Sequence, residues 1–108
     1  MPVRAIQVHA KDNVATVVEE VAAGEEVVVD LAGQETTLRA IQAIPIGHKV
    51  ALREIAEGEV VVKYGEAIGR ATQAIPVGAY VHVHNMASQR VWRTHSEPGG
   101  ELAPGRLV

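Results

Sequence analysis

The stretch Ile44-Pro45-Ile46-Gly47, which runs directly into His48, Lys49 and Val50, contains the pattern that decides the fold. An apolar residue is followed by proline, one variable residue and glycine, and a strand-like segment then begins. Proline presets its φ angle for a corner, and glycine adopts the backbone conformation that would strain a residue with a Cβ atom. We expect the leading isoleucine to anchor the corner in the core.

The same pattern occurs at three other places, with alanine in place of proline in two of them. The glycines are irregularly spaced, so the copies do not form a solenoid. They predict a mainly β domain, compact and barrel-like or clip-like, in which Gly and Pro turns join short strands. The four corners comprise residues 21–24, 44–47, 55–58 and 75–78.

Composition supports one small β-rich domain. The chain has 108 residues and is 47% hydrophobic, which is enough for a single core. Its apolar residues are mostly Val, Ile and Ala, and branched side chains favour strands. We expect strands over 3–9, 14–18, 27–31, 35–38, 49–52, 60–63, 67–72 and 79–84. Tight turns are expected at Ala32-Gly33 and at 63–66, and Gly69 indicates a bulge or a close backbone approach.

Charge and cysteine content limit the partners and the compartment. The net charge is −3 and the Lys and Arg residues are scattered, which excludes the basic surface that a nucleic-acid partner requires. The chain has no cysteine, and no stretch approaches the roughly 20 apolar residues of a membrane span. We therefore expect a cytoplasmic protein without membrane association, with a domain over 1–87 and a flexible tail over 88–108.

Two clusters of polar residues are candidates for chemistry. His9, Asp12 and Asn13 bring an imidazole, a carboxylate and an amide to one predicted turn, although Asp and Asn also favour turns for purely conformational reasons. His82 and His84 lie two apart on the predicted last strand, so both side chains would point to one face. They suit a metal site with a third ligand from His48, His9 or Asp12, or they are solvated.

Three further residues have both a functional and an ordinary interpretation. Lys49 and Lys63 are either surface lysines or, if desolvated beside a substrate carboxylate, an anion clamp or a general base. Asn85 either caps the last strand or binds a substrate hydroxyl.

Several segments together resemble the SAF domain of the altronate/galactarate dehydratase family, and the resemblance covers residues 4–87. In that family the domain is either the N-terminal module of a fused enzyme or a separate small subunit. The segments are Val8-His9-Ala10-Lys11-Asp12-Asn13-Val14-Ala15, Ile46-Gly47-His48-Lys49-Val50-Ala51-Leu52, Val62-Lys63-Tyr64-Gly65-Glu66 and His82-Val83-His84-Asn85.

The resemblance implies a β-clip fold and a lyase that is completed by a separate, larger catalytic subunit. The family reaction removes water from a sugar acid such as altronate or galactarate and gives a 2-keto-3-deoxy acid. It usually uses a divalent metal, here expected to be iron(II), with manganese(II) as the alternative. A sister branch eliminates sulfite from sulfolactate. SAF-type modules also occur as non-catalytic domains that bind carbohydrate or a partner, and this alternative stays open.

The resemblance also implies roles for individual residues. His9 or His48 is expected to ligate the metal, with Asp12, His82 and His84 as further candidate ligands. Lys49 is expected to bind the substrate carboxylate, with Asn13 and Asn85 as further substrate contacts. The candidate catalytic residues are His48, Lys49, Lys63 and Tyr64. Beyond the resemblance, Val91 and Trp92 either belong to the flexible tail or anchor it on the large subunit.

Overall fold

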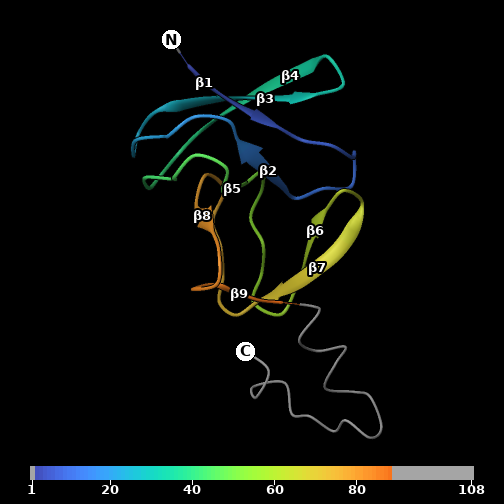
Figure 1. The fold of residues 1–108 in the computed structure, drawn as a ribbon. Coiled ribbons are helices and arrows are strands. Elements are labelled where there is room, and N and C mark those ends of the chain that lie inside the picture. Colours follow the sequence, from blue (N-terminus) through green and yellow to red (C-terminus); the bar gives the residue numbers. More distant parts are fainter. Residues whose placement is uncertain (1, 89–108) are drawn as a thin grey trace, which may run out of the picture.

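Short strands joined by tight turns make up the structure, a computed structural model that describes residues 2–88 (Figure 1). This part of the chain contains nine strands and no helix, so it has no helix that could cross a membrane. The strands are β1 (Val3–Ile6), β2 (Val14–Val17), β3 (Glu26–Leu31), β4 (Gln34–Arg39), β5 (Lys49–Ala51), β6 (Val60–Lys63), β7 (Glu66–Ala71), β8 (Tyr80–Val81) and β9 (Met86–Ser88). The predicted β-clip class is confirmed.

The strands form two sheets. Six of them lie in the order β4-β3-β1-β2-β5-β8, and the other three in the order β6-β7-β9. All neighbours are antiparallel except β1 and β3, which run parallel. In Figure 1 the β6–β7 hairpin lies at the lower right, below β1, β3 and β4 and on the opposite side from β8, and β9 lies at the far end of β7.

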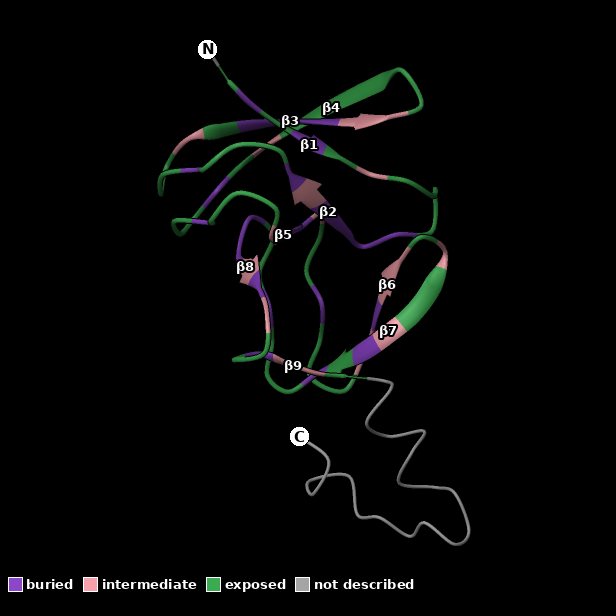
Figure 2. Ribbon diagram, in the orientation of Figure 1, coloured by how far each residue is buried: buried purple, intermediate pink, exposed green. Residues whose placement is uncertain are grey.

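Two apolar clusters form the core. Val3 and Ala5 of β1 are buried while Arg4 and Ile6 are exposed, which is the alternation expected of a half-buried strand. One cluster packs under β1, β2, β3 and β5, and the other lies where the three-stranded sheet meets β2, β5 and β8. Figure 2 shows these buried segments and the mostly exposed β4 at the sheet edge.

The four Gly corners are confirmed as the organising turns. Their glycines have φ angles between 83° and 89°, and their leading Val or Ile residues are at most 1% exposed. In the second corner the N–H of His48 donates to the carbonyl of Pro45, so proline is the first residue of the turn and not one of its two central residues. Glycine then takes the third position, where a positive φ is required.

The corners also pair two by two. Val21 and Ile44 exchange two backbone hydrogen bonds of 2.9 Å, and Ile55 and Ile75 exchange two of 2.8 Å. Val21 and Ile44 belong to the first core cluster, and Ile55 and Ile75 belong to the second. Each pair of corners therefore closes one half of the domain.

The two predicted hairpin turns and the role of Gly69 are confirmed. Ala32 and Gly33 have φ angles of 51° and 90°, and Tyr64 and Gly65 have angles of 59° and 75°. Positive values at both central residues match the twist of a two-residue hairpin. The β6–β7 register shifts opposite Gly69, and a Cβ atom there would collide with the backbone carbonyl of Ala87.

The predicted strand over 79–84 is wrong beyond Val81. Residues 82–85 form a turn, because Asn85 donates its backbone N–H to the carbonyl of His82 and accepts the N–H of His82 on its side-chain oxygen. His82 and His84 therefore do not share one face of a strand. Strand β1 likewise ends at Ile6 and not at His9. The domain boundary predicted at 87 falls inside β9, and the rest of the predicted tail, with Val91 and Trp92, lies outside the described residues.

Candidate functional site

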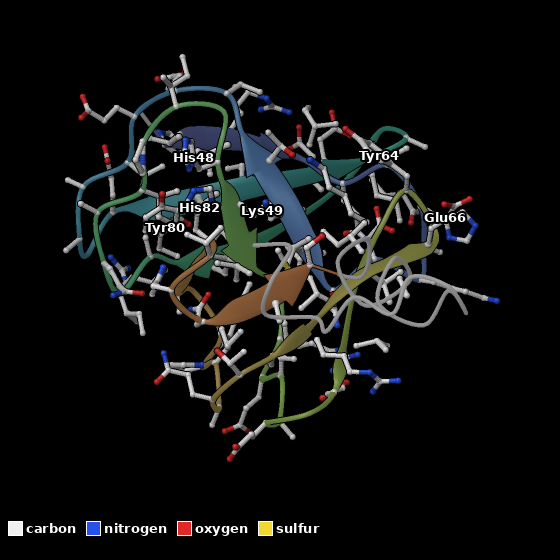
Figure 3. All side chains as sticks on the ribbon, turned by 60° about the horizontal axis from the view of Figure 1, so that its bottom comes forward. His48, Lys49, Tyr64, Glu66, Tyr80 and His82 are labelled. Atoms are coloured by element: carbon white, nitrogen blue, oxygen red, sulfur yellow. The ribbon has the colours of Figure 1, made fainter. Side chains whose placement is uncertain are left out.

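A cluster of aromatic rings lies at the start of β5 and the end of β8. His48 directly follows the second corner, and its Nδ1 atom lies 2.7 Å from the hydroxyl of Tyr80. The rings of His48 and His82 have centroids 4.8 Å apart, and the ring of Tyr80 stacks on that of His82 at 5.7 Å. Figure 3 shows these three side chains together on one side of the molecule.

Tyr80 is the member of this cluster that the sequence did not indicate. It contacts all three imidazoles of the cluster, including that of His84 at a centroid distance of 5.2 Å. The pairing of β5 with β8, in which Val50 lies opposite Tyr80, brings the phenol to His48. In the sequence, Tyr80 could have been found only as a tyrosine in the predicted strand that leads to His82.

Lys49 lies beside the ring cluster. Its side chain is half-buried, and its pKa is lowered mainly by this burial and further by the positive charge of Lys63. Within residues 2–88 the ion pairs involve only Arg4 and Arg53 as cations, so Lys49 has no carboxylate partner there. An unpaired, partly desolvated ammonium group is suited to binding an anion.

The imidazoles of the 82–85 turn face different surroundings. Burial lowers the pKa of His82, and the charges of His48, Lys49 and His84 lower it further. His82 is thus part of the same electropositive region as Lys49. The exposed His84 also lines a hollow of about 320 Å³ next to Gln42, Gln73 and Pro76. The turn therefore separates two histidines that the predicted strand would have placed side by side.

The first turn forms a second cluster, in which Asp12 joins two parts of the chain. Its carboxylate accepts N–H groups of Val8 and His9 at 3.3 and 3.0 Å and that of Gly65 at 2.7 Å. Burial alone would raise the pKa of Asp12, but the hydrogen bonds from Gly65, His9, Tyr64 and Val8 together lower it. The carboxylate is therefore occupied by backbone donors, which leaves its predicted role as a metal ligand without support in the geometry.

His9 packs against the hairpin turn between β6 and β7. Its Nδ1 atom accepts the backbone N–H of Lys11 at 3.0 Å. A Cβ atom on Gly65 would lie 2.8 Å from its ring, so the glycine makes room for the imidazole. Next to it, the ammonium of Lys63 lies 4.9 Å from the ring centroid of Tyr64, a cation–π contact. Figure 3 places Tyr64 away from His48, Tyr80 and His82.

The two asparagines have structural partners. Asn13 is 0% exposed, and its amide donates to the carbonyl of Val60 and accepts the N–H of Val62. Asn85 is 4% exposed and bonds the backbone of Tyr80 and His82. Each amide donates one bond and accepts one bond that help to fix the strands and turns around the two clusters. Their roles as substrate contacts stay predictions.

The described residues do not form a complete metal site. Between residues 2 and 88 no group of three or more His, Asp or Glu side chains is arranged to hold an ion. His48 and His82 supply at most a pair of neighbouring imidazoles, while His9 and Asp12 belong to the other cluster. This donor set does not fit a divalent metal without ligands from elsewhere.

Fold and site together define a small β-clip module with a surface of imidazoles and lysines suited to an anion. Comparison with known proteins is more specific. Residues 3–89 match the family described as the altronate/galactarate dehydratase SAF domain, and the chain belongs to this family.

Two kinds of relatives differ in length. The chain is 45% identical over 87 residues to the (2R)-sulfolactate sulfo-lyase subunit alpha of Chromohalobacter salexigens, which covers 77% of this chain and 93% of the relative. It is 49% identical over 80 residues to the altronate dehydratase of Escherichia coli and 38% identical over 80 residues to that of Bacillus subtilis. These matches cover 74% of this chain but only 15% of each dehydratase.

Proposed function

We propose that this chain is the small component of a cytoplasmic lyase and acts with a larger catalytic chain on a sugar acid. The complex would remove water from a substrate such as altronate or galactarate and release a 2-keto-3-deoxy acid. Membership of the SAF family and the likeness to altronate dehydratases support this proposal. Because the chain spans only 15% of those relatives, the rest of the active site would come from the larger chain.

Lys49 is the observation that carries the proposal. A half-buried ammonium without a carboxylate partner in residues 2–88 leaves a positive charge for an anion from outside. Lys63 adds a second positive charge to the same region. A substrate carboxylate is an anion of the required charge and size.

The reaction explains why such a charge is useful. Elimination begins with removal of the proton next to the carboxylate, which is a poor acid, and negative charge then spreads onto the carboxylate as an enediolate. A fixed cation at that position stabilises the transition state, in which negative charge builds up on the carboxylate, more than it stabilises the bound substrate. Lys49 would hold the carboxylate and Lys63 would add to the local field. The proposed metal, iron(II) or manganese(II), would take most of its ligands from outside residues 2–88, because that part holds no complete donor set.

Elimination of sulfite from sulfolactate is the second candidate. It is favoured by one observation, the match to nearly the whole length of a sulfo-lyase subunit alpha. Sulfolactate has a carboxylate as well as a sulfonate, so the role of Lys49 is the same in both reactions. The two candidates differ in the leaving group, which is water in one and sulfite in the other.

Co-expression decides between these candidates and a non-catalytic binding module. The chain would be produced together with a candidate large subunit, supplied with iron(II), and assayed on altronate, galactarate and sulfolactate for keto acid and for sulfite. Lys49→Met should lower kcat/KM roughly ten- to a hundredfold, the loss expected for one charged hydrogen bond. Lys11→Met, at an exposed lysine, is the matched control and should retain activity. Inactivity of the wild-type complex on all three acids would favour the binding module.

A further inference from the structure

Hydrogen bonds fix the backbone of both residues in the contact between Tyr80 and His48. His48 donates its N–H to Pro45 and accepts that of Val17, both within the second corner and its neighbour β2. The N–H of Tyr80 donates to Oε1 of Gln42 at 2.9 Å, and its carbonyl accepts from Nδ2 of Asn85 at 2.9 Å. The 2.7 Å contact between the two side chains is therefore held from both sides.

The chemistry of the two groups determines which of them donates the proton. A neutral imidazole has one N–H and one lone pair, and a phenol has a single O–H with a pKa of about 10. The phenol is much the stronger acid of the two, and an imidazole nitrogen is a better acceptor than a phenol oxygen. No other side chain in the described part of the chain bonds the hydroxyl of Tyr80 or the Nδ1 atom of His48.

We propose that Tyr80 donates its hydroxyl proton to Nδ1 of His48 and so fixes the neutral imidazole as the Nε2–H tautomer. Tyr80 is thus a positioning residue, and His48 presents a hydrogen-bond donor at Nε2. This assignment differs from the metal-ligand role that the family resemblance implies, because a metal would need the Nε2 lone pair. Nε2 has no partner within residues 2–88, so the donor is available to a molecule from outside.

The consequence for catalysis rests on the proposed function. A neutral imidazole that donates from Nε2 can bind the oxygen on which negative charge develops, next to the carboxylate held by Lys49. It would stabilise the enediolate without first losing a proton, and no proton transfer by His48 is required in that step.

Long-range ¹H–¹⁵N correlation spectra of the full ¹⁵N-labelled chain, recorded at a pH where its imidazoles are neutral, test the tautomer. We expect His48 to show a protonated Nε2 and an unprotonated Nδ1. In Tyr80→Phe the same signals should move toward a mixture of both tautomers. Tyr64→Phe is the matched control, because Tyr64 is 58% exposed and contacts Lys63 but not His48.

The outcomes separate this inference from the proposed function. A wild-type spectrum with protonated Nδ1, or with an averaged mixture, would overturn the inference even if the assembled lyase is active. Unchanged His48 signals in a folded Tyr80→Phe chain would overturn the role of Tyr80. If the chain gives the expected spectra but is inactive with every large subunit, the inference about the tautomer holds and only the proposed function is contradicted. If Tyr80→Phe does not fold, the wild-type spectrum still decides the tautomer.

Discussion

The carboxylate of Asp12 accepts a hydrogen bond of 2.7 Å from the backbone N–H of Gly65, which lies 53 positions further along the chain. The same side chain accepts the N–H groups of Val8 and His9. One carboxylate thus fixes the first turn to the β6–β7 hairpin and holds His9 against Gly65. This position explains why the carboxylate of Asp12 is buried and accepts three backbone N–H groups.

Asp12→Ala should destabilise the chain by about 1–3 kcal/mol, because it leaves partly buried N–H groups without an acceptor. Urea unfolding at neutral pH measures the change. Glu57→Ala, at an exposed corner residue, is the control and should have little effect. Equal stability of both variants would show that the N–H groups find water instead.

The effect of Asp12 should depend on pH. Its pKa in the folded chain is lowered, since hydrogen bonds from Gly65, His9, Tyr64 and Val8 outweigh the effect of burial. A carboxyl group with a lowered folded pKa contributes stability above its unfolded value of about 4, and this contribution is lost as the pH falls through the folded value. The stability difference between wild type and Asp12→Ala should therefore shrink in acid. A constant difference down to acidic pH would contradict the assignment.

The corner glycines should not all respond alike to alanine, although their φ angles are nearly equal. Gly47 has a φ of 83° and open space where a Cβ would lie, whereas a Cβ on Gly78 would collide with the backbone carbonyl of Arg39. Gly47→Ala should cost only about 1–2 kcal/mol, the penalty of a left-handed conformation for a residue with a Cβ. Gly78→Ala should cost clearly more, or prevent folding. Thermal unfolding of both variants checks the order, and equal losses would mean that the turn alone determines the cost.

Asn13→Ala separates a structural role from a substrate role. The amide donates to the carbonyl of Val60 and accepts the N–H of Val62 in β6. Its loss should therefore lower the free energy of unfolding by about 1–3 kcal/mol. In the assembled lyase the folded variant should keep its KM for substrate. A tenfold higher KM at unchanged stability would restore the predicted role in substrate binding.

The corners could be predicted because the residues that specify each of them are adjacent in the sequence. An apolar residue and, three positions later, a glycine in the third position of the turn form a pattern of four consecutive residues, as in 44–47. The hairpin at Ala32-Gly33 and the constraint on Gly69 are of the same kind. The strand was wrongly predicted beyond Val81 because the segment 81–84 alternates like a strand. The side chain of Asn85 instead makes a turn there. Alternation cannot reveal a side-chain bond to the backbone.

The candidate site was less predictable because its contacts are distant in sequence. His48 and Lys49 were indicated by a motif, but Tyr80 reaches His48 only through the β5–β8 register. Asp12 and Asn13 were correctly placed in a turn, yet their partners are backbone groups of residues 60–65. Residue type shows what a side chain can bind, and only the fold shows which of its atoms are already used.

Lys49→Met should stabilise the isolated chain at neutral pH while it lowers the activity of the complex. The pKa of Lys49 is lowered by burial and then by Lys63, so the folded state binds this proton less tightly than the unfolded state does. The charged form therefore costs stability below the folded pKa, and this cost fades as the pH rises through that value. Methionine keeps an apolar stem without the charge.

Urea unfolding of wild type and Lys49→Met from neutral to alkaline pH measures this difference, which should be largest near neutrality and shrink at high pH. Lys11→Met, at an exposed lysine, should show no such trend. Lys63→Met should reduce the effect without abolishing it, because burial is the larger cause of the lowered pKa and remains in that variant. A Lys49→Met chain that is less stable than wild type at neutral pH would mean that the ammonium contributes to folding and is not held ready for an anion.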